Sequence, residues 1–211
     1  MRGLLKERGI VLHTSRVPVE VRAGELVTAP REAIAADRVI SLPRLIGPAM
    51  EGLPQDADGF IRVDVHGRVE GMGDVFAAGD ATTWPIKQGG LAAQQADAAA
   101  EAIAAQVGIL TDPEPFRPVL RGLLLTGGTP RYMRAEVSGG RGEDWEVSEH
   151  ALWWPPGKIA GRYLTPYLAL RHGELRRPPG GMDIRLDMVI ATGAHGRAVP
   201  VPVQRWRPAR G

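Results

Sequence analysis

The chain has 211 residues, of which 44% are hydrophobic and 24% charged, proportions typical of a soluble globular protein with one or two domains. Its formal net charge is only +2 and its basic residues are spread out, so we expect no nucleic-acid partner. It contains no cysteine, which excludes disulfides, thiolate metal sites and a redox dithiol within the chain.

The first part of the chain carries one helical pattern and several strand patterns. Residues 4–8 resemble the last turns of a helix that Gly9 ends. Charged residues interrupt any apolar segment here, and no run of about 18 apolar residues follows. We therefore expect neither a signal peptide nor a transmembrane helix, and the cytoplasm is the default location. Strands are predicted over residues 10–13, 17–27 (a hairpin turning at Ala23-Gly24) and 36–42.

The segment from residue 60 to residue 81 ends in a strand-to-glycine motif. Residues 60–65 alternate and predict a strand with one solvated face. Residues 75–78 predict a short buried strand, Gly79 permits a close approach, and Asp80 follows at the end where ligands bind in open α/β sheets. A carboxylate there suits the hydroxyls of a ribose or ribityl chain. The alternative interpretation is a turn in which Asp80 caps a helix.

Residues 89–106 are predicted to form a long alanine-rich helix. Helices usually carry acids in their first turn, but the first acid here is Asp97, and Lys87 lies just before the start. The N-terminus is therefore left positive, as a site for an anion or an electron-rich carbonyl requires. The alanines predict close packing against a sheet. A solvated stripe is predicted to include Gln94, Asp97 and Glu101.

Three prolines in residues 111–118 predict a linker to a further domain. Strands are predicted there over residues 119–125, 132–137 and 184–191, a helix over 159–172, and a polar glycine-rich loop over 138–144. Trp153 and Trp154 with Tyr163 and Tyr167 suit a quinone-facing or membrane-interface surface, or alternatively a small aromatic core. The five histidines of the chain show no ligand spacing, so no metal site is predicted.

Four stretches come in an order that resembles two-dinucleotide-domain flavoproteins. They are residues 37–40, 58–64, 75–81 and 87–93. The chain is similar over roughly residues 1–172 to the pyridine nucleotide-disulfide oxidoreductase superfamily, closest to its sulfide:quinone oxidoreductase and type II NADH dehydrogenase-like branch. The most specific part of the resemblance is the run from Val75 to Asp97.

The resemblance implies an α/β fold, α+β as a fragment: a partial FAD/NAD(P)-binding three-layer β/β/α fold plus a C-terminal α+β domain. The implied domains are the end of an NAD(P)-binding domain (residues 1–65), the C-terminal part of an FAD-binding domain (66–110) and a C-terminal domain (111–211).

The resemblance also implies an FAD site. In the family the aspartate matching Asp80 binds the FAD ribityl chain, and the backbone matching Gly90 and Leu91 faces the flavin pyrimidine edge. Lys87 would add a positive charge nearby and favour the reduced, anionic flavin. The implied cofactor-binding residues are Gly79, Asp80, Ala81, Lys87, Gln88, Gly89, Gly90 and Leu91.

The Gly-x-Gly-x-x-Gly turns that hold dinucleotide pyrophosphates in this family are missing from the sequence. The nearest pattern, residues 71–76, lacks the third glycine and precedes a strand. The chain therefore resembles the C-terminal part of a flavoprotein, and we expect it to bind FAD weakly or not at all by itself, with NAD(P)H a cofactor of the full-length protein. A partial sheet exposes an edge and an apolar face, which predicts a homo-oligomer or capture of a missing N-terminal half.

Two functions are compatible with these patterns. The first is part of an FAD-dependent oxidoreductase that transfers electrons between a pyridine nucleotide or small reductant and a quinone-like acceptor. Without cysteines, sulfide oxidation is not expected. The second is a non-catalytic binding or assembly module derived from a flavoprotein scaffold. A peripheral membrane or quinone contact would fit the first.

Overall fold

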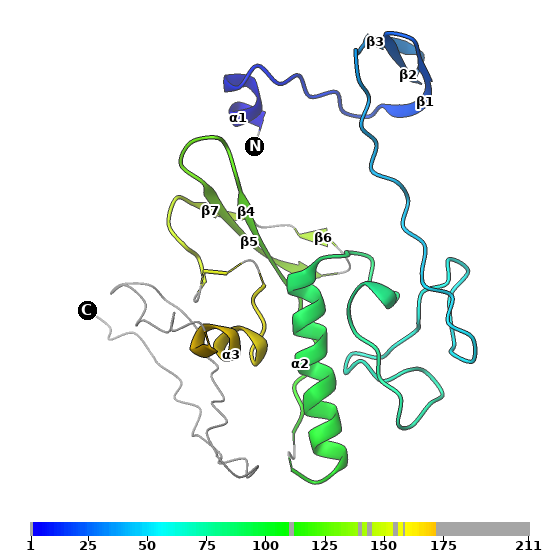
Figure 1. The fold of residues 1–211 in the computed structure, drawn as a ribbon, viewed down its shortest axis with the longest axis vertical. Helices are drawn as coiled ribbons and strands as arrows, with labels where there is room; N and C mark the ends of the chain where they lie inside the picture. The colour runs from blue at the N-terminus through cyan, green and yellow to red at the C-terminus, as the bar shows by residue number, and fades with distance from the viewer. Residues whose placement is uncertain are drawn as a thin grey trace. The chain divides into compact units, whose positions relative to one another are not determined.

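The computed structural model describes residues 2–109, 112–138, 141–142, 145–153, 156–157 and 159–171 (Figure 1). The chain divides into two compact units, Met1–Leu45 and Ile46–Gly211. Helices and small antiparallel sheets make up the described residues, so the fold is α+β at the coarse level. The predicted division into the end of an NAD(P)-binding domain, part of an FAD-binding domain and a C-terminal domain stays a prediction.

The first unit contains one short helix and a three-stranded antiparallel meander. The elements are α1 (Arg2–Glu7), β1 (Val17–Arg22), β2 (Glu25–Ala29) and β3 (Glu32–Ala35), in sheet order β1-β2-β3. Gly9 follows the helix with φ +68°, and Gly24 turns the hairpin with φ +78°, so the predicted helix end and hairpin are confirmed.

The strands predicted over residues 10–13 and 36–42 are wrong. Both segments are irregular. The third strand of the sheet is instead β3, which pairs with β2. The large apolar side chains of these segments are exposed, with Val11 at 75% and Leu42 at 95%. An apolar run becomes a strand only where a neighbouring strand supplies the ladder, and no described segment pairs with these two.

In the second unit, residues 46–88 form turns and isolated bridges around a short 3-10 helix, η1 (Gly79–Ala81). The strands predicted over 60–65 and 75–78 are reduced to single bridges, among them Ile61 with Thr82. Gly59, Gly67 and Gly71 adopt positive φ and reverse the chain every few residues. Neighbouring segments therefore pair through isolated bridges and do not form an extended ladder. The Ile61 N–H nevertheless donates to the Ala81 carbonyl at 2.8 Å, which fixes η1 beside this segment.

The long helix α2 (Gly89–Gln106) has the predicted bounds. Its alanines allow the close packing that was predicted, although loop backbone and not a regular sheet lies against them. A Cβ added to Gly67 would lie 3.1 Å from the Cβ of Ala99, and one added to Gly79 would lie 3.0 Å from the Cβ of Ala92. Larger residues on this face of α2 would push the two glycine turns away.

A small sheet and a third helix follow. The elements are β4 (Val119–Leu124), β5 (Arg131–Ser138), β6 (Arg141–Gly142), β7 (Glu146–Ser148) and α3 (Leu164–Arg171). The predicted β4–β5 hairpin is confirmed, and β5 also pairs with β6 and β7. β6 lies inside the segment predicted as a loop, and α3 begins five residues later than predicted. His172, the predicted strand over 184–191 and Trp154 lie outside the described residues.

One face of the sheet packs on α2. Leu91 of α2 forms a buried cluster with Leu120, Ala135 and Val137, which Trp84, Ile86 and Phe116 extend. Trp153 is also buried, and its ring meets that of Tyr132 edge-on at 5.4 Å, so part of the predicted aromatic surface is packed inside. In the described part of the chain, no helix has the length and apolar character needed to cross a membrane.

The outer edge of β4 is closed by side-chain amides of α2. Gln94 accepts a hydrogen bond from the Val119 N–H at 2.9 Å and donates to the Val119 carbonyl at 3.0 Å. The Gln88 amide donates to the Arg121 carbonyl at 2.9 Å. An open strand edge presents unpaired backbone groups that favour association with other chains. These two glutamines occupy such groups along this part of β4.

The solvated stripe predicted on α2 is wrong. Glu101 is only 5% exposed, and Asp97 accepts hydrogen bonds from the backbone N–H groups of Arg162 (2.5 Å) and Tyr163 (3.4 Å). Burial raises the pKa of Asp97, and these two N–H groups act in the opposite direction. The segment before α3 therefore covers the charged side of α2. Gly161 allows this approach, since a Cβ there would lie 3.2 Å from an Asp97 carboxylate oxygen.

Candidate functional site

The predicted site residues lie in two adjacent pieces of the second unit, η1 and the start of α2. Gly79, Asp80 and Ala81 form η1, and Gln88 to Leu91 span the N-cap and first turn of α2. The two elements are in contact, with Ala92 of α2 against Gly79. The structure therefore brings together the residues that the sequence predicted to share a site. Asp80 is exposed, so its carboxylate can reach a ligand in solvent.

Gly79 is fixed by its conformation, by a close contact and by a hydrogen bond. Its φ of +82° is rarely adopted by residues with a Cβ. Its N–H donates to Oε1 of Gln95 at 2.5 Å, and the Gln95 amide also donates to Oγ1 of Thr82 at 3.3 Å. Thr82 is completely buried. The turn is thus held on α2 by a buried polar group, and Asp80 projects from a rigid base.

Lys87 precedes the first residue of α2 by two positions, and Asp80 is close enough to act on its charge. Its ammonium donates to the Thr82 carbonyl and sits 3.9 Å from the centroid of the Phe60 ring. Burial lowers the pKa of Lys87, while the negative charges of Asp80 and Asp56 act in the opposite direction. The amine is therefore half-buried, with two carboxylates close enough to stabilise its positive charge.

The N-terminus of α2 has no acidic residue in its first turn. Gln88 is the N-cap, but its side chain does not cap the helix because it bonds to the Arg121 carbonyl. The first N–H groups of a helix have no intrahelical partner, and they carry the positive end of the helix dipole. Gly89 is exposed, whereas Gly90 and Leu91 are buried. Of this turn, the Gly89 end is the part that faces solvent.

These groups fit one part of a flavin nucleotide. Asp80 offers an exposed acceptor for hydroxyl groups, and the Gly89 end of α2 with Lys87 offers positive charge for a carbonyl or an anion. There is room at Gly89, because a Cβ built there would have no atom nearer than 3.9 Å. The Gly79 N–H is committed to Gln95 and is not available to a ligand. No glycine-rich turn of the pyrophosphate-binding type accompanies these groups in the sequence.

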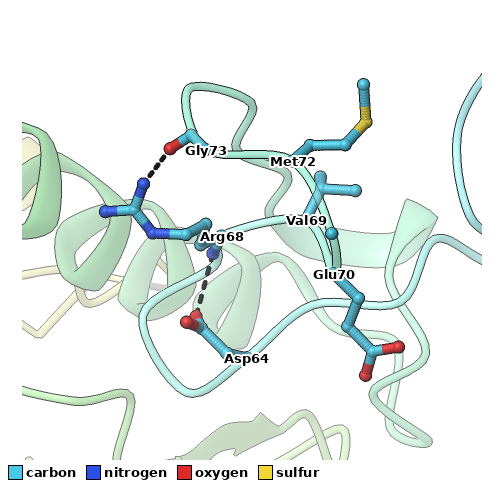
Figure 2. A pocket seen from close by; sticks show the side chains of 7 residues that line it. Asp64, Arg68, Val69, Glu70, Met72 and Gly73 are labelled. Carbon is cyan, nitrogen blue, oxygen red and sulfur yellow. Dashed lines mark hydrogen bonds between the residues drawn. The ribbon is translucent and has the colours of Figure 1, made fainter.

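A separate pocket of about 320 Å³ lies in the segment that precedes η1 in the chain. It is lined by Asp64 and residues 68–73 (Figure 2). Figure 2 shows Arg68 joined to the Gly73 carbonyl by its guanidinium and to the Asp64 carboxylate by its backbone N–H. The guanidinium also bonds Gln106 at 3.2 Å and lies 4.8 Å from the Phe76 ring centroid. The polar groups of Arg68 thus bond to the protein itself and close the turn. The pocket includes none of the predicted site residues.

Four residues that contact or act on the predicted site residues were not predicted from the sequence to belong to the site: Asp56, Phe60, Thr82 and Gln95. Asp56 accepts hydrogen bonds from the N–H groups of Asp58 (3.0 Å) and Phe60 (2.9 Å), an Asx turn for which Asp56-Ala57-Asp58-Gly59 is a typical sequence. The role of Gln95 had no such signal, since a glutamine inside an alanine-rich helix is usually solvated.

No protein-family model matches the chain, and a search of curated proteins finds no significant match. Within the described residues, no group of three or more histidine, cysteine, aspartate or glutamate side chains is arranged to hold a metal ion.

Proposed function

We propose that the chain is part of an FAD-dependent oxidoreductase that transfers electrons between a pyridine nucleotide or small reductant and a quinone-like acceptor. The observation that carries this proposal is the exposed carboxylate of Asp80 beside Lys87 and an unneutralised helix N-terminus. The same proposal includes a partial FAD/NAD(P)-binding fold followed by a C-terminal domain. This fold assignment rests on the sequence resemblance.

In this proposal each group has a physical task. Asp80 accepts hydrogen bonds from the ribityl hydroxyls, and the start of α2 orients the pyrimidine edge of the ring. Lys87 adds a positive charge that burial makes more effective, because a low dielectric screens it less. Gln95 keeps Gly79, and with it Asp80, in place. A bound flavin would supply the acceptance and release of electrons.

The proposal predicts that the chain binds riboflavin about as tightly as FAD, within a few-fold, because the phosphates find no dedicated turn. Equilibrium titration of each flavin with the protein, followed by flavin fluorescence, measures both affinities. Much tighter binding of FAD would show that the chain has a pyrophosphate site and would contradict the partial-site account. Absence of binding for both flavins would favour the second function, a non-catalytic binding or assembly module.

A further inference from the structure

Arg121 is a half-buried cation for which the described residues offer no counter-charge. No described carboxylate pairs with it, and its Nε atom is enclosed without a hydrogen-bond partner. Burial lowers the pKa of Arg121, and the like charge of Arg134 lowers it further. A guanidinium removed from water without a partner is costly, so such a group in a folded domain calls for an anion.

The strand register places a second arginine directly opposite. Arg121 of β4 pairs with Arg134 of β5, and the adjacent pair Leu120–Ala135 belongs to the buried cluster on α2. Since side chains alternate along a strand, the two arginines lie on the face of the sheet that turns away from α2. Like charges directly opposite each other destabilise a sheet unless an anion lies between them.

Among the described residues, the two acids on this face lie next to Arg134, and neither forms an ion pair with Arg121. Glu136 pairs with the Arg134 guanidinium at 3.0 Å, and Glu146 of β7 is the cross-strand neighbour of Arg134 on the far side. Glu146 is therefore two strands from Arg121, about 10 Å by the usual strand spacing. Arg121, on the outer strand, has Arg134 directly opposite, and Glu136, which pairs with Arg134, lies diagonally across on the same face.

We propose that Arg121, with Arg134 opposite, binds a small oxyanion of the carboxylate or phosphate type on the face of the β4–β5 sheet that turns away from α2. The guanidinium fork matches two oxygens of such a group, and this inference does not rest on the proposed flavin function. The ligand would be an anionic substrate or an anionic end group of one.

Thermal unfolding of the full chain in phosphate, acetate and chloride at equal ionic strength tests this site. For the wild type we expect the unfolding midpoint to rise saturably with phosphate or acetate above the chloride value. Arg121→Met should remove this rise and raise the midpoint in chloride, because it removes an uncompensated charge while keeping an unbranched side chain of similar reach. Arg121→Lys should weaken the apparent phosphate affinity by about tenfold, since the fork is lost.

The matched control is Arg131→Met, which removes an arginine of the same strand pair that already has Glu149 as its partner. This variant should keep the full response to phosphate or acetate. Broadening of the phosphorus resonance of inorganic phosphate by wild-type protein gives a second reading if Arg121→Met fails to fold. The proposal is overturned if the wild type responds to neither anion beyond chloride, or if Arg121→Met and Arg131→Met respond equally.

Discussion

Replacing Glu101 with alanine should lower the free energy of unfolding of the Ile46–Gly211 unit by about 3 kcal/mol, as expected when one partner of a buried ion pair is removed. The Glu101 carboxylate accepts hydrogen bonds from the Tyr163 hydroxyl at 2.6 Å, the Glu114 N–H at 2.7 Å and the Arg162 guanidinium. Without it, three donors on the segments covering α2 lose their acceptor. Urea denaturation of both proteins measures the difference.

Glu149→Ala is the matched control, because its ion pair with Arg131 is exposed and should contribute less than about 1 kcal/mol. A loss for Glu101→Ala no larger than that of Glu149→Ala would contradict the central place given to Glu101 in this cluster.

The pH dependence of stability reports the same cluster. Burial, and then the hydrogen bond to Glu101, raises the pKa of Tyr163 to about 12, above its ordinary value of 10.0. A raised pKa in the folded state means that the neutral phenol contributes stability, fully present below pH 10 and lost as the pH rises towards 12. In Glu101→Gln the tyrosinate absorbance of Tyr163 should appear at lower pH than in the wild type. If the tyrosinate absorbance appears at the same pH in both proteins, Glu101 does not contribute to the raised pKa of Tyr163.

Gly79→Ala should destabilise the same unit by about 2–4 kcal/mol, from the positive φ and from overpacking together. The φ of Gly79 is +82°, and the new Cβ would lie 3.0 Å from the Cβ of Ala92. The change would also displace the N–H that Gln95 binds, and with it Asp80. Chemical denaturation gives the magnitude.

Gly108→Ala isolates the contribution of the backbone conformation. Gly108 has a φ of +77°, but no atom lies within 4 Å of a Cβ built there. We expect this variant to lose only about 1–2 kcal/mol. If both variants lose the same free energy of unfolding, the contact of Gly79 with Ala92 contributes little to stability, and this contact does not hold Asp80 in place.

The sequence predicted well those elements whose signals are local. The alanine-rich run gives α2 its length, Gly9 and Gly24 mark a helix end and a hairpin turn, and the segment around residues 126–130 marks the β4–β5 hairpin. Each depends on the propensity or conformation of a few neighbouring residues. The grouping of η1 with the start of α2 was also predictable, because short spacing along the chain brings them together.

Elements that depend on distant partners were predicted poorly. The alternation of residues 60–65 indicates a strand, yet the turns at Gly59 and Gly67 leave only single bridges. The polar residues of α2 read as a solvated face, but Gly161 allows the segment from 159 to 163 to cover them. The burial of Glu101 depends on Arg162 and Tyr163, which lie 61 and 62 residues away along the chain. Local periodicity carries no information about such contacts.

In the proposed flavin site Asp80 is the carboxylate that would accept hydrogen bonds from the hydroxyl chain, and a riboflavin titration of Asp80→Asn tests this role most directly. We expect the affinity to fall about tenfold, as the loss of a charge-assisted hydrogen bond implies. Asp112→Asn, which changes an exposed aspartate away from η1 and the start of α2, should bind like the wild type. Equal riboflavin affinities for the wild type and Asp80→Asn would contradict the proposed site.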